Sequence, residues 1–253
     1  MSDSAPRLLV VQHEASTGPG WFGRWLADAG LELDVRHPYA GDELPALDAL
    51  DASGLLVLGG AMAPADDADC PWLPATRALM SAAVDARLPT FGICLGAELL
   101  ALGRGGDVRR GTAGPELGVL DVEVDSGGAA GADPVFGALP ARVRVVQWHW
   151  EEIAALPDGA VVLASSPAYR HQAFRLGDAA WGVQGHPEVT GDIAASWARE
   201  DSPLLVAAGR SPDDLVAEVR GAEDELAATW QPLAAAFAEV VRDFHRDSGS
   251  PAR

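Results

Sequence analysis

Hydrophobic residues in the first hundred positions form short continuous runs that alternate with segments of helical spacing. The continuous runs at residues 8–12, 55–58 and 88–93 predict buried strands, and residues 31–35 alternate in the manner of a further strand. Apolar positions within residues 21–29 and 74–87 recur at the period of a helix that buries one face. Strands that are apolar throughout are covered on both sides. The pattern therefore predicts an α/β fold whose mostly parallel sheet carries helices on both faces.

The second half of the chain is richer in strands and then returns to helix. Gly, Pro and Asp turns separate five apolar or alternating segments, at residues 118–124, 143–146, 161–163, 171–175 and 180–184. From residue 215 to 244, apolar residues recur every three or four positions, and Pro232 is expected to end or kink this helix. We therefore expect one domain over residues 1–201 and a helical C-terminal extension over residues 202–253, packed on the core or on a partner.

Composition narrows the functional classes. The chain has 253 residues, of which 48% are hydrophobic, and a net charge of -19, which argues against a nucleic-acid partner because phosphate contacts come from Lys and Arg. No apolar run could span a bilayer, and the first residues lack a basic segment followed by an apolar one, so we expect a cytoplasmic protein with no membrane partner. Two cysteines, Cys70 and Cys94, cannot form a disulfide framework or a metal cluster by themselves. We expect no metal and no cofactor, and the sequence sets no oligomeric state.

Cys94 lies where a predicted strand turns into a predicted helix. Gly92 and Gly96 stand two residues before and two residues after it, as a strained turn with crowded neighbours requires. At such an elbow the thiol would be presented at the sheet edge, and the positive end of the helix dipole would favour the thiolate. A cysteine packed in the core is the other interpretation of this segment taken alone.

Two further segments favour a nucleophile. His186 follows the strand at residues 180–184, and Pro187 keeps it extended, so Glu188 projects to the same side as His186. A carboxylate that binds one ring nitrogen leaves the other free to act on a nucleophile, as in a catalytic triad. Taken alone, the His-Pro-Glu segment could be a surface turn. Together with the elbow, it predicts a catalytic group.

An oxyanion would also need hydrogen-bond donors. The turn Gly59-Gly60 ends the strand at residues 55–58 and offers approachable backbone N–H groups, and the amide of Leu95 offers another at the start of the helix. We expect the amides of Gly60 and Leu95 to form an oxyanion hole, although an ordinary tight turn would also explain the glycine pair.

These motifs resemble those of a known family. Gly-Ile-Cys-Leu-Gly at residues 92–96, Leu-Gly-Gly at 58–60 and Gly-Val-Gln-Gly-His-Pro-Glu at 182–188 are similar to motifs of the class I glutamine amidotransferases, whose glutaminase domains use a cysteine triad. The similarity runs from residue 8 to about residue 197 and is closest to stand-alone members of the GMP-synthase-like type. It implies a flavodoxin-like sheet and a triad of Cys94, His186 and Glu188.

The resemblance also implies glutamine as the substrate. Main-chain groups near Trp148, His149 and Trp150 would help to bind its α-amino and α-carboxylate ends, and Gly59 is expected among the substrate contacts. At Glu98, four residues after the cysteine, the family usually has a substrate-binding glutamine. A carboxylate there can accept a bond from an α-ammonium group but repels an α-carboxylate.

Three functions are open at this point. The first is a glutaminase that releases ammonia and glutamate through a thioester, with ammonia passing to a separate synthetase because no synthetase domain follows in this sequence. The second is a stand-alone γ-glutamyl peptide or amide hydrolase, favoured by Glu98, by Gly185 before the histidine and by the helical extension. The third, of another class, is a flavodoxin-like non-catalytic binding module with a phosphate loop at residues 16–20, where Pro19 would interrupt the run of N–H donors.

Overall fold

The computed structural model describes residues 5–248, so residues 1–4 and 249–253 of the two expected regions lie outside the described part. The strands, in chain order, are β1 (Arg7–Val11), β2 (Glu32–Arg36), β3 (Gly54–Val57), β4 (Thr90–Ile93), β5 (Asp107–Arg110), β6 (Glu116–Val124), β7 (Arg142–His149), β8 (Glu151–Ala155), β9 (Ala160–Ser165), β10 (Ala173–Leu176) and β11 (Ala180–Val183). The α-helices are α1 (Gly20–Asp28), α2 (Leu73–Asp85), α3 (Leu95–Gly103), α4 (Gly191–Glu200), α5 (Ser202–Ala207) and α6 (Pro212–Ser248).

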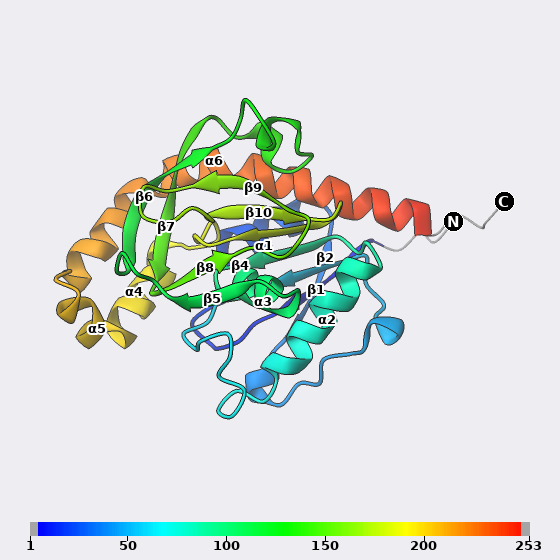
Figure 1. Cartoon of the computed structure of the whole chain (residues 1–253), viewed down its shortest axis with the longest axis horizontal. Coiled ribbons are helices and arrows are strands. Elements are labelled where there is room, and N and C mark those ends of the chain that lie inside the picture. Colours follow the sequence, from blue (N-terminus) through cyan, green and yellow to red (C-terminus); the bar gives the residue numbers. More distant parts are fainter. Residues whose placement is uncertain (1–4, 249–253) are drawn as a thin grey trace.

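One large sheet forms the centre of the molecule, with the strand order β2-β1-β3-β4-β11-β10-β9-β6-β7 (Figure 1). The pairs from β2 to β11 are parallel, and those from β11 to β7 are antiparallel. Strand β4, which precedes Cys94, lies between β3 and β11, so the segments that follow these three strands meet at one sheet edge. The predicted α/β class with a parallel sheet is confirmed.

Helices cover both faces of the parallel half (Figure 1). Within β1, Leu8 and Val10 belong to the apolar cluster that includes α1 and α6, whereas Leu9 and Val11 belong to the cluster that includes α2 and α3. This alternation follows from the period of two in a strand. All four side chains are fully buried, which explains why the sequence shows a continuous apolar run there.

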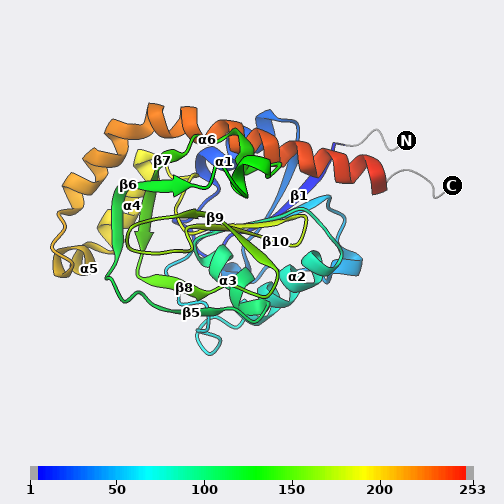
Figure 2. The same ribbon diagram turned by 45° about the horizontal axis from the view of Figure 1, so that its top comes forward.

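The predicted C-terminal helix is longer than expected. Helix α6 runs from Pro212 to Ser248 with Pro232 inside it, so Pro232 does not end the helix, and the alternative expectation of a kink stays a prediction. A proline removes one backbone hydrogen bond, but buried apolar residues on both sides of it, among them Trp230 and Phe237, fix the helix to the sheet. Figure 2 shows α6 curving over α1 and the sheet. The division of the chain at residue 202 stays a prediction.

Two short strands were not predicted. β5 and β8 form a separate two-stranded antiparallel sheet, in which Arg110 pairs with Glu151 and Arg109 pairs with Glu152. Both strands are short and carry charged residues, so they lack the apolar run or the alternation that marks a strand in sequence. This small sheet places Glu151, two residues after His149, at the edge of the site. None of the helices described between residues 5 and 248 is long and apolar enough to cross a membrane.

Candidate active site

The chain turns sharply at Cys94, between β4 and α3. Its backbone has φ 49° and ψ -107°, a positive φ that is rare for a residue other than glycine. The flanking glycines are required by close approach. A Cβ on Gly92 would lie 2.6 Å from the carbonyl oxygen of Gly96, and a Cβ on Gly96 would lie 2.1 Å from that of Val57. The elbow inferred from the sequence is therefore present.

The pKa of the Cys94 thiol is the net result of opposing effects. Burial raises it well above its ordinary value, and the carboxylates of Glu98 and Glu188 raise it further. The Leu95 N–H at the start of α3 lowers it, in the direction expected of a helix N-terminus, without outweighing them. Ionisation of this thiol therefore needs a base close by.

His186 and Glu188 form a buried pair. The Nδ1 of His186 lies 2.7 Å from Oε1 of Glu188, and both residues are at most 3% exposed. Because the carboxylate accepts at Nδ1, the neutral ring carries its proton there and leaves Nε2 as an acceptor. Nε2 is buried and has no hydrogen-bond partner among the described residues. The ring packs edge-on against Trp197 at 4.7 Å, and its backbone N–H donates to Val146, so its position is fixed.

The glycine pair after β3 lies between the cysteine and the histidine. A Cβ on Gly59 would lie 3.0 Å from Cε1 of His186 and 3.7 Å from the Cβ of Cys94. Gly60 lies against Leu95, since a Cβ there would come within 2.9 Å of Cδ2 of that side chain. Within the described part of the chain, the Gly60 amide donates to no protein acceptor. The arrangement leaves a backbone donor next to the elbow.

A cavity of about 180 Å³ opens at this edge of the sheet. Its wall includes Cys94, Gly60, His186 and four of the predicted substrate contacts, namely Glu98, Trp148, His149 and Trp150. Gly59, Leu95 and Glu188 lie behind this wall. The structure thus brings the predicted residues together from β3, β4, α3, β7 and the segment after β11.

Glu98 faces the cavity from the first turn of α3. It is 3% exposed, and Nε2 of Gln184 donates to its Oε1 at 2.9 Å. Burial raises the pKa of Glu98 to about 7, an effect that the bond from Gln184 and the nearby His149 only partly offset. Near neutral pH, Glu98 therefore exchanges between a carboxylic acid and a carboxylate beside the thiol.

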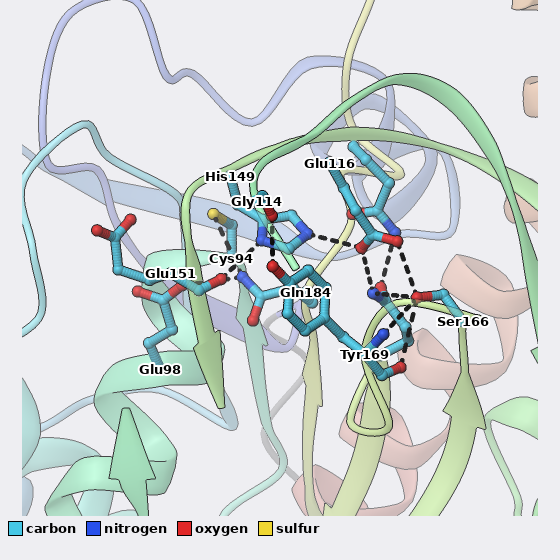
Figure 3. A network of polar contacts seen from close by, with 11 residues as sticks. Cys94, Glu98, Gly114, Glu116, His149, Glu151, Ser166, Tyr169 and Gln184 are labelled. Carbon is cyan, nitrogen blue, oxygen red and sulfur yellow. Dashed lines mark hydrogen bonds and ion pairs between the residues drawn. The ribbon is translucent and has the colours of Figure 1, made fainter. Parts of the chain in front are cut away.

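His149 lines the cavity, and its ring belongs to a buried polar network (Figure 3). Its Nδ1 donates to the backbone oxygen of Glu151 at 2.7 Å, and Nε2 lies 3.0 Å from Oε2 of Glu116. Ser166 and Gln172 also donate to Glu116. Burial acts to raise the pKa of Glu116, but these hydrogen bonds outweigh it and the net shift is downward. The network fixes the segment whose main chain was expected to bind substrate.

Several residues of the site were not predicted. Glu14, Glu200 and Asp201 line the cavity, and Arg110 lies 3.3 Å from Glu151 and over the ring of Trp150. Only Gln184 could have been inferred, because it lies in the segment that carries the histidine and acid. The other residues come from loops and helix ends, where no periodicity marks a side chain as facing a site.

The loop at residues 16–20 does not have the surroundings of a phosphate site. Ser16 donates to the carboxylate of Glu200 at 2.8 Å, and Thr17 donates to the backbone oxygen of Glu14. Gly20 has φ +46° and begins α1 after Pro19. Carboxylates beside this loop would repel a phosphate group, which disfavours the binding-module interpretation.

Comparisons with known proteins agree with this geometry. The model of the glutamine amidotransferase class-I family matches residues 22–196. The chain is 30% identical over 186 residues to a subunit of glutamine-hydrolysing GMP synthase from Methanoculleus marisnigri, covering 73% of this chain and 89% of that protein. It is 29% identical over 169 residues to gamma-glutamyl peptidase 4 of Arabidopsis thaliana, covering 66% of each.

Solved structures show the same relationship. A glutamine amidotransferase from Thermotoga maritima superposes with a TM-score of 0.82 at 26% identity and covers 93% of this chain and 99% of its own. One from Methylobacillus flagellatus gives 0.80 at 30% identity, covering 95% and 96%. The chain belongs to the class I glutamine amidotransferase family, and the flavodoxin-like fold implied by the sequence motifs is confirmed.

Proposed function

We propose that this chain hydrolyses the side-chain amide of a γ-glutamyl group through a triad of Cys94, His186 and Glu188. The observation that carries the proposal is the unpartnered Nε2 of His186. This nitrogen is buried, and His186 and Cys94 line the same cavity. The other ring nitrogen, Nδ1, is hydrogen-bonded to Glu188. A buried acceptor without a partner is costly unless a ligand or a reacting group uses it.

In the first half of the reaction, Nε2 of His186 takes the thiol proton and Sγ of Cys94 attacks the γ-carbonyl carbon. The carbonyl electron pair moves to oxygen, and the N–H groups of Gly60 and Leu95 stabilise the resulting oxyanion. The tetrahedral intermediate collapses as its carbon–nitrogen bond breaks. His186 returns the proton to the leaving nitrogen, so the amine departs neutral and a thioester remains on the cysteine.

Water completes the cycle. His186 removes a proton from a water molecule as its oxygen attacks the thioester carbonyl, and Sγ leaves and regains the proton. Glutamate is released and the thiol is restored. Glu188 keeps the imidazole in the productive tautomer throughout and stabilises its positive form. Because the resting thiol is protonated, the transfer to His186 is part of the attack and does not precede substrate binding.

The glutamyl end of the substrate would lie between α3 and the segment after β7. Glu98 would accept from its α-ammonium group, and main-chain groups of Trp148, His149 and Trp150 would bind its α-carboxylate. The Glu116 network supports this assignment, because it anchors that segment from behind. A repelling effect of Glu98 on the α-carboxylate is reduced when Glu98 is protonated.

Free glutamine is the first candidate substrate, with ammonia as the nitrogen product. Three relatives are named as subunits of glutamine-hydrolysing GMP synthase, and they support a separate synthetase as the enzyme that receives ammonia from this chain. We place the reaction in the cytoplasm, where a reducing environment keeps the free thiols Cys70 and Cys94 reduced.

A γ-glutamyl amide or peptide is the second candidate substrate. The carboxylates of Glu14, Glu200 and Asp201 line the same cavity, and they favour an amide whose leaving amine is cationic over a peptide that ends in a carboxylate. The relatives named gamma-glutamyl peptidases support the same chemistry with an amine in place of ammonia.

Release of glutamate and ammonia from glutamine and from γ-glutamyl amides tests the proposal. Cys94→Ser is expected to lower the rate by at least about a thousandfold, because a hydroxyl cannot replace the thiol in a site built around it. Cys70→Ser is the matched control, since Cys70 is also a free buried cysteine but lies outside the cavity. Equal activity of wild type and Cys94→Ser, or no activity of wild type on any γ-glutamyl amide, would refute the proposal.

A further inference from the structure

The carboxylates of the cavity form two groups. Glu98 and Glu151 form an inner pair beside the thiol, and each raises the pKa of Cys94 after the larger effect of burial (Figure 3). Glu14, Glu200 and Asp201 form a second group, called the acidic rim below. All three residues line the same cavity, and after the larger effect of burial the charges of Glu200 and Asp201 raise the pKa of Glu14 further.

Among the described residues, no arginine bonds directly to the acidic rim; Arg199 donates to the Ser196 hydroxyl, which in turn donates to Glu200. Within the described residues, its three carboxylates form no ion pair. They accept only from neutral donors: the Ala61 N–H, the Ser16 and Ser196 hydroxyls and the Trp148 indole N–H. Arg110 is the arginine on the cavity wall, and it is held by Glu151 and the ring of Trp150. The rim therefore remains a concentration of negative charge.

The acidic rim lies on the same side of the cavity as His186. His186, which would protonate that amine, packs against Trp197 at 4.7 Å, and Trp197 precedes Glu200 by one turn of α4. Trp148 contacts Trp197 at 5.8 Å and donates its indole N–H to Asp201 at 2.8 Å. The inner pair lies instead against α3 and β8, on the side expected to hold the glutamyl unit.

A glutamyl unit carries one cation, its α-ammonium, and the inner pair is enough to bind it. Glutamine, whose leaving group is ammonia, has no second cation for the acidic rim to bind. An ordinary γ-glutamyl peptide ends in a carboxylate, which the acidic rim would repel. The unpartnered, buried Nε2 of His186 faces the same cavity and independently marks the place of the leaving nitrogen. Leu204, 53% exposed on α5, provides apolar surface along the cavity wall.

We propose that the acidic rim binds a second, positively charged amino group on the leaving side, so that the preferred substrates are γ-glutamyl amides of aliphatic diamines. The inference rests on the proposed function and specifies its substrate class. Sγ of Cys94 bonds to the γ-carbonyl carbon, the carbon–nitrogen bond breaks, and the near nitrogen leaves with the proton from His186. The products are a free diamine and, after attack by water, glutamate.

The test compares three γ-glutamyl amides of equal length, made from 1,4-diaminobutane, butylamine and 4-aminobutyrate. Their distal ends are cationic, neutral and anionic. We expect kcat/KM for the cationic amide to exceed that for the neutral amide by at least about tenfold, since three carboxylates near the surface each contribute a modest factor. The anionic amide should be the poorest substrate. Added salt should reduce the preference for the cation, because part of the rim is open to solvent.

Glu200→Arg tests the rim directly. Glu200 is exposed at the end of α4, so the substitution leaves the core intact. It is expected to lower the ratio of cationic to neutral kcat/KM by about tenfold and to improve the anionic amide relative to wild type. Glu123→Arg, at an exposed position on β6 outside the cavity, makes the same change in net charge and serves as the matched control. It should leave the ratio unchanged.

The outcomes separate the two proposals. Equal kcat/KM on the three amides in wild type, or the same ratio in wild type and Glu200→Arg, would overturn the inference and leave the cysteine mechanism intact. No hydrolysis of any of the three amides or of glutamine would refute the proposed function and the inference with it. A cation preference that falls in Glu200→Arg and persists in Glu123→Arg would support both.

Discussion

Replacing Glu98 by glutamine removes a buried charge without changing the shape of the side chain. Gln184 donates to Oε1 of Glu98, and a glutamine at position 98 offers an oxygen acceptor in the same place. The substitution therefore isolates the free energy of ionising a carboxyl group in the wall of the cavity. It also restores the residue type that the family usually has at this position.

The magnitude follows from the pKa of Glu98. Folding raises this pKa from its ordinary value of 4.5 to about 7, chiefly by burial. A raised pKa means that the unfolded chain loses the proton first, so the stabilising contribution is complete below about pH 4.5 and is lost as the pH rises to 7. The whole loss corresponds to about 3 kcal/mol, of which about 2 kcal/mol falls between about pH 5.5 and about pH 8.

Urea unfolding of wild type and Glu98→Gln at about pH 5.5 and at about pH 8 measures this change in unfolding free energy. Both pH values lie above the pI of about 4.5, so the protein carries negative charge in both measurements. The variant should gain about 2 kcal/mol in unfolding free energy relative to wild type as the pH rises, because it has no proton to lose at this position. Glu123→Gln is the control, because it measures how the loss of one exposed carboxylate changes the unfolding free energy under the same conditions. The same difference between wild type and Glu98→Gln at both pH values would show that the cavity does not desolvate this carboxyl group.

Three other substitutions test the site and its support. Gly96→Ala should lower the unfolding free energy by about 3 kcal/mol or more, since the new Cβ would lie 2.1 Å from the carbonyl oxygen of Val57. Gly221→Ala is the control: this glycine has open space around it in α6, so the substitution should raise the unfolding free energy by about 0.5–1 kcal/mol in the same urea titration. Glu188→Gln should lower kcat by about 10³–10⁴-fold with little change in KM in steady-state assays, because the imidazole loses its orienting charge. Glu116→Ala should cost about 2 kcal/mol in unfolding free energy, because it removes the acceptor of the buried His149 Nε2 and one of the acceptors of Ser166 and of Gln172; a loss below about 1 kcal/mol would show that water replaces the carboxylate.

The fold was largely predictable because its centre is apolar on both faces. β1, β3 and β4 appear in the sequence as continuous hydrophobic runs, and their bounds match to within two residues. β5 and β8 escaped prediction since they pair only with each other and carry charged residues. The apolar spacing on both sides of Pro232 left open whether α6 ends or kinks there, because packing against the sheet, which sequence does not display, decides whether a helix continues past a proline.

The site was predictable where backbone geometry dictates residue type. The elbow at Cys94 needs Gly92 and Gly96, and an extended His-Pro-Glu segment brings His186 and Glu188 together, so local sequence carries both features. The sequence indicated the effect of the helix N-terminus on the thiol but not the larger opposing effects on its pKa, because desolvation and neighbouring carboxylates depend on residues far apart in the chain. The acidic rim was missed for the same reason: its members come from the loop after β1 and from the end of α4.

Helix α6 has a consequence for how the protein is made. Phe237 contacts Phe91 of β4 and Trp181 of β11, so the strands on either side of the elbow depend on a residue that the ribosome adds long after both. Until α6 emerges, the α1 face of these strands is exposed apolar surface, a species prone to aggregation. The nucleophile, one residue beyond β4, therefore gains its rigid setting only when synthesis of this helix is nearly finished, which couples the appearance of activity to the end of translation of α6.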